Sequence, residues 1–475
     1  MTLRACCTSP HLLERQEDAE LPGSPDVPAP AAPGSAPASP SEGAAGGGDG
    51  ALPVAVIGAG PVGLAAAARL VRRGLPTVVL EAGPGPGASV REWGHVRLFS
   101  PWDLCLDPVA AEMLEEAGWD PPPADELPSG SELVERYLEP LAELEGLRGA
   151  IRYGHRVTAV TRDGRDRLKG TDDRGQLPFL LRWEADGVPG HLRARAVIDA
   201  SGTWTRPRPL GGHGLPALGE EEAADRIRYG IHDVLGADRG RYAGRRTAVV
   251  GAGHSAANVL LDLVRLGEDA PGTEALWILR GGRPGRVFRR EEDGDDQLEA
   301  RGALERTLRE EVEAGRIEMV TGFGTRAVER RDGIVALVAE DGRSLAADRV
   351  VGVTGFRPDL EMLRELRLDM DPLTEAPRAL GPLIDPNLHD CGTVPPHGAE
   401  ELGHPEPGFY MVGMKSYGRA PTFLLPTGYE QVRSVVAALA GDEEAARSVD
   451  LELPGTGVCR ADAALETDAG EACRV

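Results

Sequence analysis

One short pattern occurs twice in this chain of 475 residues. In each copy a Val-rich segment runs into a glycine-rich turn, and an Ala- and Leu-rich segment follows. The copies start near Val54 and near Thr247. Buried strands of parallel sheets have continuous apolar sequences, and a strand, a glycine-rich turn and a helix in this order form the unit that binds dinucleotides. The repetition therefore predicts an α/β protein with two nucleotide-binding units.

The first copy contains the parts of a dinucleotide site in order. We expect a strand over residues 54–57, a helix over 64–73 and a second strand over 77–80 that ends at Glu81. Glu81 stands where a carboxylate binds ribose hydroxyls, and its charge would repel a 2′-phosphate. The site therefore favours an adenine dinucleotide that lacks this phosphate, and FAD fits. A glycine-rich turn without a ligand is the alternative.

The glycines of the first turn have separate mechanical roles. Gly58 makes the tight turn, Gly60 lets the backbone approach a pyrophosphate, and Gly63 lets helix and strand pack closely. The free N–H groups at the start of the helix then face the phosphates. The predicted cofactor-binding residues of this turn are Gly58, Gly60, Pro61, Val62 and Gly63.

The second copy ends its next strand, residues 275–279, in Arg280 instead of an acid, with Arg283 just beyond. A guanidinium there suits a 2′-phosphate, so this site is predicted to prefer NADPH; plain surface charge is the alternative. Ser255 is placed to donate to a pyrophosphate oxygen, and we interpret His254 as a local hydrogen-bonding residue. The predicted binding residues of the turn are Gly251, Gly253, His254, Ser255 and Ala256.

Charge and cysteine spacing exclude several classes of protein. The formal net charge of −24 argues against nucleic-acid binding. No Cys-x-x-Cys pair is present, which argues against zinc ribbons and redox dithiols, and the His and Cys residues near Cys391 match no metal site. The start of the chain lacks a secretory pattern, and charged or glycine residues interrupt the one long apolar run, so we expect a cytoplasmic protein without a membrane span.

Together the two sites predict a flavoprotein in which NADPH reduces FAD. Two NAD-type sites, or one functional site and one relic, are the alternatives. Further short motifs support the first interpretation, namely Asp199-Ala-Ser-Gly-Thr203 before the second copy and Val353-Thr-Gly-Phe-Arg-Pro-Asp359 after it. With the two glycine turns, they make the chain resemble the two-dinucleotide flavoproteins, and within that superfamily the flavin-containing, NADPH-dependent monooxygenases. A fainter resemblance is to flavoproteins of actinobacterial arsenic-resistance loci.

The resemblance implies two doubly wound Rossmann-like domains, with the NADPH domain inserted in the FAD domain. It implies that Gly413 ends the last strand of the FAD domain and that a helix starting near Thr427 and Gly428 points at the flavin. The expected organisation is a disordered Pro/Ala/Gly-rich arm (1–50), an N-terminal segment of the FAD domain (51–205), the NADPH domain (206–346), a C-terminal segment of the FAD domain (347–441) and a peripheral tail (442–475).

The chain also departs from the monooxygenase pattern. Of the signature that precedes the second glycine turn only His232 is present, and Met414 stands where an acid often follows the last strand. Near the flavin we expect an extended stretch on which Trp93, His95, Arg97 and Phe99 share one face. Trp93 or Phe99 would stack on the flavin, and Arg97 would bind it and stabilise its negative charge. Arg97 and His95 are the candidate catalytic residues. A loop that only packs against the domain is the alternative.

The resulting prediction is an FAD-dependent oxidoreductase reduced by NADPH, specifically a monooxygenase that acts through a flavin hydroperoxide on a small molecule with oxygen. Tyr417 and Arg419 are expected to line its substrate pocket. An NADPH-dependent flavin reductase or dehydrogenase is one alternative, and a redox-sensing nucleotide-binding regulator is another. Residues 305–313 are expected to form an exposed helix of mixed charge.

Overall fold

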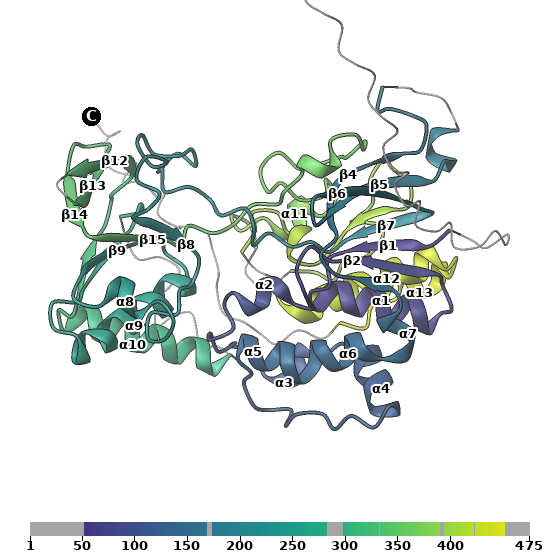
Figure 1. Ribbon diagram of the computed structural model, residues 1–475, viewed down its shortest axis with the longest axis horizontal. Coiled ribbons are helices and arrows are strands. Elements are labelled where there is room, and N and C mark those ends of the chain that lie inside the picture. Colours follow the sequence, from purple (N-terminus) through teal and green to yellow (C-terminus); the bar gives the residue numbers. More distant parts are fainter. Residues whose placement is uncertain are drawn as a thin grey trace, which may run out of the picture. The chain divides into compact units, whose positions relative to one another are not determined.

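Two five-stranded parallel sheets organise the fold (Figure 1). The computed structural model describes residues 52–168, 173–282, 298–331, 333–389, 394–421 and 423–451. The predicted arm at residues 1–50 lies outside these ranges, as does most of the predicted tail. The first sheet has the order β16-β7-β1-β2-β3, and the second has the order β11-β10-β9-β15-β8.

The first sheet is covered by different layers on its two faces. On β1, Val54 and Val56 belong to a core cluster with helix α1 (Pro61–Arg72) and helix α12 (Leu425–Leu439), which lie side by side in Figure 1. Ala55 and Ile57 point to the other face and pack with the antiparallel sheet β4-β5-β6. The strands are β16 (Phe409–Met411), β7 (Ala196–Asp199), β1 (Val54–Ile57), β2 (Thr77–Leu80), β3 (Ile151–Arg152), β4 (Arg156–Arg162), β5 (Phe179–Ala185) and β6 (Val188–Ala194).

The second sheet repeats this arrangement. Val249 of β9 packs with helices α9 (His254–Asp269) and α10 (Glu299–Glu313), whereas Ala248 and Val250 pack with the antiparallel sheet β12-β13-β14. Both faces of each parallel sheet are thereby buried, as its continuous apolar strands require. The strands are β11 (Ile317–Val320), β10 (Glu274–Ile278), β9 (Arg246–Val250), β15 (Arg349–Gly352), β8 (Ile227–Tyr229), β12 (Thr325–Arg331), β13 (Ile334–Ala339) and β14 (Ser344–Ala347).

The segment that forms the second sheet is inserted, in the sequence, between two strands of the first sheet. All its strands lie in sequence between β7 and β16, which confirms the predicted insertion. Strand β15 still belongs to the second sheet, so the chain leaves that sheet only after Gly352, beyond the expected boundary at residue 346. The two connecting segments pair with each other, because Arg208 N–H donates to the Gly355 carbonyl at 2.9 Å and Arg357 N–H to the Arg206 carbonyl at 2.9 Å.

Helices α1 and α12 begin earlier than the sequence pattern predicts. Helix α1 starts at Pro61 and α12 at Leu425, and in both a proline occupies the first turn. Proline has a fixed φ suited to this turn and no N–H that would need a partner there. The remaining helices are α2 (Ala88–Arg91), α3 (Trp102–Cys105), α4 (Pro108–Glu116), α5 (Gly130–Leu133), the π-helix η1 (Val134–Leu138), α6 (Glu139–Glu143), α7 (Glu145–Arg148), η2 (Arg174–Gln176), α8 (Arg239–Tyr242), η4 (Glu361–Leu363), α11 (Gly381–Ile384), η5 (Gly413–Lys415) and α13 (Glu443–Arg447).

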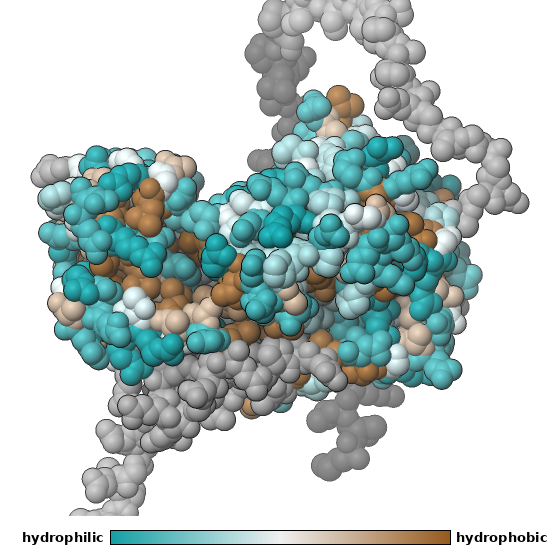
Figure 2. Space-filling view, turned by 90° about the horizontal axis from the view of Figure 1, so that it is seen from below, coloured by the Kyte–Doolittle hydropathy of each residue, from teal (hydrophilic) through white to brown (hydrophobic). Residues whose placement is uncertain are grey.

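The face shown in Figure 2 is mostly hydrophilic, with hydrophobic residues visible in the recesses between the polar ones. Within the described ranges, no helix combines the length and the apolar character that crossing a bilayer requires.

Candidate functional site: two glycine turns

The first glycine turn joins β1 to α1, and its glycines differ in what surrounds them. A Cβ atom on Gly63 would lie 2.0 Å from the Gly58 carbonyl oxygen, so helix and strand approach as closely as predicted. Gly58 has φ +99°, a conformation that side chains rarely adopt. A Cβ on Gly60 would meet nothing within 4 Å. The open space at Gly60, beside the first N–H groups of α1, is therefore the place where a pyrophosphate can reach the backbone.

Glu81 follows β2 and is bound to the turn. Its Oε2 accepts a hydrogen bond from Ala59 N–H at 2.6 Å, and its Oε1 accepts one from Gly83 N–H at 2.6 Å. These contacts fix the carboxylate beside the glycine turn. Each oxygen retains acceptor capacity, so the side chain fits a ribose hydroxyl there, and this role stays a prediction.

Gly413 and Gly428 come close to the same turn. A Cβ on Gly413 would lie 3.2 Å from Cγ2 of Val62, and a Cβ on Gly428 would lie 2.6 Å from that atom. Thr427, beside Gly428, is buried. The structure thus brings the predicted residues of the last strand and helix together with Val62, three hundred and more positions away in the sequence.

A buried ion pair that the sequence analysis missed lies at the same edge of the sheet. Lys415 Nζ is 2.6 Å from Oδ2 of Asp199, and it also donates to Ser201 Oγ at 3.0 Å. Ser201 in turn donates through its backbone N–H and its hydroxyl to Oδ1 of Asp199. The motif that begins at the end of β7 is therefore linked to the segment after β16 by a buried ion pair and the hydrogen bonds of Ser201.

The expected extended stretch around residues 91–102 is wrong. Helix α2 ends at Arg91, and the next residues turn, because Gly94 N–H donates to the Arg91 carbonyl at 3.1 Å and Val96 N–H to the Trp93 carbonyl at 3.0 Å. In a turn the alternate side chains do not share a face. The Trp93 ring lies against Gly130, where an added Cβ would be 2.9 Å from Cε3.

The two candidate catalytic residues are on the surface. Arg97 is exposed, donates to the Leu127 carbonyl and lies 3.7 Å from the Glu132 carboxylate. His95 is exposed as well and faces Asp262 of α9. Burial raises the pKa of Asp262, and the charges of Arg265 and His95 act in the opposite direction. The catalytic roles of Arg97 and His95 stay predictions.

The second glycine turn has the same construction as the first. A Cβ on Gly251 would lie 2.3 Å from the Val353 carbonyl oxygen, whereas a Cβ on Gly253 would meet nothing within 4 Å. Helix α9 begins at His254, so Ser255 lies in its first turn, and Ala256 is fully buried against the sheet. The open side of the turn is again where backbone N–H groups can meet a phosphate.

A cavity of 490 Å³ lies over this second turn. It extends from Gly253 and Ser255 to Arg280 on one side and to Met414 and the segment 418–421 on the other. The charged or ionisable side chains among its lining residues are Arg208, Arg280, Arg419 and His254, and none of the lining residues is acidic. In a chain of net charge −24, a cavity whose charged lining residues are arginines suits an anionic ligand such as a phosphorylated dinucleotide.

Of the two arginines predicted to bind a 2′-phosphate, the structure describes one. Arg280 is exposed at the end of β10, and its Nη1 donates to the Gly212 carbonyl at 3.1 Å. Arg283 lies outside the described residues.

Of the residues expected to line the substrate pocket, Arg419 lines the cavity over the second glycine turn. Tyr417 is instead fully buried beside Phe423, and burial raises the pKa of its hydroxyl.

Helix α10 differs from the exposed helix that was expected over residues 305–313. Its residues 305–313 are not uniformly exposed, because Glu305 and Leu308 are buried. Oε1 of Glu305 lies 2.8 Å from Nε2 of His254, at the start of α9. The sequence holds a signal for this, since Arg301, Glu305 and Leu308 are spaced as one helical face and are buried together.

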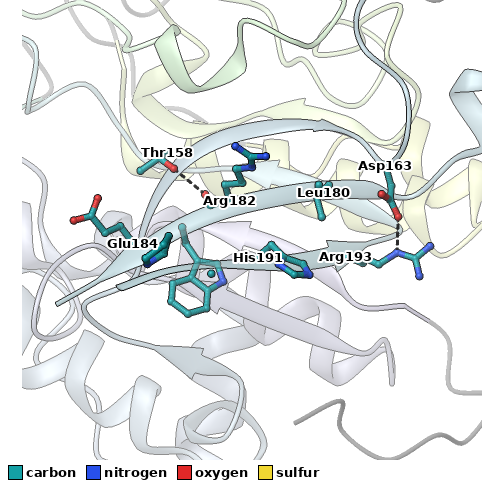
Figure 3. Close-up of a pocket in the computed structure, with 10 residues that line it drawn as sticks. Thr158, Asp163, Leu180, Arg182, Glu184, His191 and Arg193 are labelled. Carbon is teal, nitrogen blue, oxygen red and sulfur yellow. Dashed lines mark hydrogen bonds and ion pairs between the residues drawn. The ribbon is translucent and has the colours of Figure 1, made fainter. Parts of the chain in front are cut away.

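A separate hollow lies on the antiparallel sheet β4-β5-β6 (Figure 3). It is lined by side chains of both charge signs, and Arg193 in it pairs with Asp163 at 2.8 Å. None of its lining residues belongs to the two glycine turns of the parallel sheets or to the start of a helix, so we assign no ligand to this hollow. Among the described residues, no group of three or more His, Cys, Asp or Glu side chains is placed to hold a metal ion.

Two parallel sheets, each with a glycine turn at the end of a central strand, define the class of two-dinucleotide oxidoreductases. Residues 52–376 match the pyridine nucleotide-disulphide oxidoreductase family, and the chain belongs to it. Membership confirms the expected fold and the expected enzyme class, a flavoprotein oxidoreductase with FAD and a nicotinamide dinucleotide as cofactors.

Relatives of known function include both reductases and monooxygenases. The chain is 26% identical over 217 residues to indole-3-pyruvate monooxygenase YUCCA6 of Arabidopsis thaliana, and the match spans 45% of each chain. The bacillithiol disulfide reductase of Bacillus cereus has a similar structure (TM-score 0.60, 17% identity, 82% of this chain and 99% of that one). So does DfoA of Erwinia amylovora, a cadaverine monooxygenase solved with FAD (TM-score 0.58, 14% identity, 86% and 99%). At these identities the two structures show the fold alone.

Proposed function

We propose that this protein is an NADPH-dependent flavin monooxygenase that oxygenates a small molecule. One observation carries the proposal. The two glycine turns differ in the side chain that ends the following strand, with Glu81 fixed at the first and Arg280 lining a cationic cavity at the second. A carboxylate disfavours a 2′-phosphate and a guanidinium favours it, so FAD belongs to the first turn and NADPH to the second.

The residues at each turn fit these groups. The backbone at Gly60 and at Gly253 is open to a pyrophosphate, and the first N–H groups of α1 and α9 provide the positive ends of two helices. Bound FAD would take a hydride from NADPH and activate oxygen, while the protein holds both cofactors and excludes water. A flavin hydroperoxide is the species we expect to act on the substrate.

The disulfide reductases of the family are the obvious rivals, and the cysteines argue against this activity. The chain has six cysteines and no Cys-x-x-Cys pair. Cys105, the one cysteine within the described ranges, is buried, and burial followed by the Asp103 charge raises the pKa of its thiol to about 12. A thiol held in this state is a poor nucleophile. Monooxygenases occur among the relatives, one of them in the sequence comparison, so oxygen is the acceptor we propose.

A flavin reductase that passes electrons to another acceptor is the second candidate. The cationic cavity extends to Met414 and Arg419, in the segment after β16 that also approaches the first glycine turn. Solvent access near the flavin favours electron transfer or release of peroxide over oxygenation. A cytoplasmic location stays a prediction from the sequence.

Rapid mixing of the purified full chain tests the proposal. The FAD-loaded protein is reduced with one equivalent of NADPH without oxygen and then mixed with oxygenated buffer. A monooxygenase gives an absorbance near that of a flavin hydroperoxide that persists for seconds or longer before oxidised flavin returns. Immediate return of oxidised flavin with one equivalent of hydrogen peroxide would reject oxygenation in favour of the reductase. A protein that neither binds FAD nor is reduced by NADPH would contradict both.

A further inference from the structure

A buried carboxylate lies behind the second glycine turn. The Glu305 side chain is 7% exposed, and its Oε1 is 2.8 Å from Nε2 of His254. Burying a carboxylate costs several kcal/mol unless a donor or a cation compensates for it. A salt-bridged surface glutamate would be unremarkable, but this one faces inward from α10 toward the start of α9. His254 is the partner that contacts Glu305 from another helix.

His254 connects this carboxylate to the cavity. It is the first residue of α9, directly after Gly253, and its side chain is one of those that line the cavity over the turn. The ring is held on a second side by Phe99, whose ring is 5.4 Å away in an edge-on contact. The imidazole is thus fixed between two neighbours and adjoins the place where a pyrophosphate meets the backbone.

The contact with Glu305 determines how the ring can be used. An ionised carboxylate only accepts hydrogen bonds, so Nε2 of His254 carries the hydrogen that is directed at Glu305. Nδ1 is then the ring nitrogen left for a ligand. When Nδ1 also carries a hydrogen, the ring can donate to Glu305 and to a phosphate oxygen at once, and hydrogen bonds to charged groups are stronger than neutral ones.

We propose that Glu305 is a positioning residue of the nicotinamide dinucleotide site, which acts through His254 on the pyrophosphate. The carboxylate orients the imidazole, and the imidazole separates the buried negative charge from the phosphates. This inference rests on the proposed function, because it presumes a dinucleotide over the second turn. It adds to that function a residue from another helix that no glycine motif contains.

Equilibrium binding to the FAD-loaded full chain tests this inference with two ligands. NADP⁺ carries the pyrophosphate, whereas 2′-AMP carries the 2′-phosphate and lacks the 5′-phosphates. For Glu305→Gln we expect the Kd of NADP⁺ to rise about ten- to hundredfold, the range for a hydrogen bond to a charged group, and the Kd of 2′-AMP to change less than about twofold. Glu310→Gln, an exposed position on the same helix, is the matched control and leaves both values unchanged.

A double-mutant cycle shows whether the two residues act as one unit. If Glu305 acts through His254, then His254→Asn and the combination of His254→Asn with Glu305→Gln weaken NADP⁺ binding by similar factors. Equal weakening of NADP⁺ and 2′-AMP in Glu305→Gln would reduce Glu305 to a structural role and overturn the inference, as would an unchanged Kd of NADP⁺. A wild-type protein that binds 2′-AMP and NADP⁺ no better than 5′-AMP would instead refute the proposed function itself.

Discussion

Lys415 Nζ lies 2.6 Å from Oδ2 of Asp199, and neither side chain has any exposed surface. Asp199 is the last residue of β7 and Lys415 lies in the turn after β16, the neighbouring parallel strand, so the pair joins the ends of two strands at the edge of the sheet where the first glycine turn lies. The sequence contains only one other lysine, Lys169, against many arginines. A lysine differs from arginine here because its compact ammonium needs only the few acceptors that Asp199 and Ser201 provide.

Replacing Lys415→Met should destabilise the protein strongly. The variant leaves Asp199 buried without its counter-charge, and breaking such a pair from one side costs about 3–5 kcal/mol. The free energy of unfolding, measured in urea on the protein freed of FAD, is the readout. Arg364→Met removes a cation from an exposed pair with Glu361 and is the control, expected within about 0.5 kcal/mol of the wild type. Similar values for the two variants would contradict the prediction.

Substitutions of two glycines in the first turn should have separate effects, one on FAD binding and the other on the stability of the apoprotein. Gly60→Val adds a side chain where nothing lies within 4 Å, so the apoprotein keeps its stability while FAD is excluded from the backbone. Gly63→Ala places Cβ against the Gly58 carbonyl, and such overpacking costs about 1–3 kcal/mol. The flavin-to-protein absorbance ratio and the urea midpoint of the apoprotein measure the two effects. Gly60→Val that retains stoichiometric FAD would show that the cofactor lies elsewhere.

Arg280→Ala should reduce the preference for NADPH over NADH. Loss of a charge-assisted bond to the 2′-phosphate is worth about 1.5–3 kcal/mol, so the ratio of the two kcat/KM values falls roughly ten- to hundredfold. Anaerobic flavin reduction with each nucleotide gives this ratio. Arg265→Ala, an exposed arginine on α9, serves as the control and leaves the ratio unchanged. An unchanged ratio in Arg280→Ala would remove the basis for assigning NADPH to the second turn.

Glu406 should make stability depend on pH in the acid range. The residue is buried between Arg162, at 2.7 Å, and Arg174. Burial alone would raise the pKa of Glu406, but the hydrogen bonds from Arg174 and Arg162 lower it below its ordinary 4.5. Since the unfolded chain takes up the proton first, this stabilisation is present above pH 4.5 and is lost as the pH falls through the lowered pKa.

Glu406→Gln tests this directly. At pH 7 the variant leaves two buried guanidinium groups without their carboxylate, and it should be about 3–5 kcal/mol less stable. The difference from the wild type should shrink as the pH falls from 5 to 3, because the wild-type carboxylate then becomes neutral. Urea unfolding across this range is the measurement, with Glu361→Gln at an exposed pair as the control. A difference that stays constant down to pH 3 would be inconsistent with a lowered pKa for Glu406.

The regions of the fold that the sequence predicts are those with local signals. The strand over 54–57 and the strand over 77–80 have the predicted limits. Each is a run of four apolar or β-branched residues between a proline and a glycine or an acid, which leaves little choice. Gly63 is identified by its spacing from Gly58, and the structure shows the close contact that spacing implies. These features depend on residues a few positions apart.

The features that the sequence does not predict depend on residues far apart. Glu406 contacts Arg162 and Arg174, and Lys415 contacts Asp199, across more than two hundred positions, and no local pattern indicates such pairs. The prediction for residues 91–99 is wrong because alternation of side-chain types resembles a strand even where backbone hydrogen bonds close a turn. The helix of Glu305 carries many charges, and only the period of Arg301, Glu305 and Leu308 reveals its buried face.

The paired connections between the two units have a mechanical consequence. Pro207 and Phe356 form an antiparallel bridge, and Arg206 pairs with Asp359 at 3.1 Å across the same two segments. The inserted segment is therefore joined to the first sheet by two strands of chain that are hydrogen-bonded to each other, not by two independent linkers. A hinge at this position would have to bend both segments together, because bending one alone breaks the bonds between them.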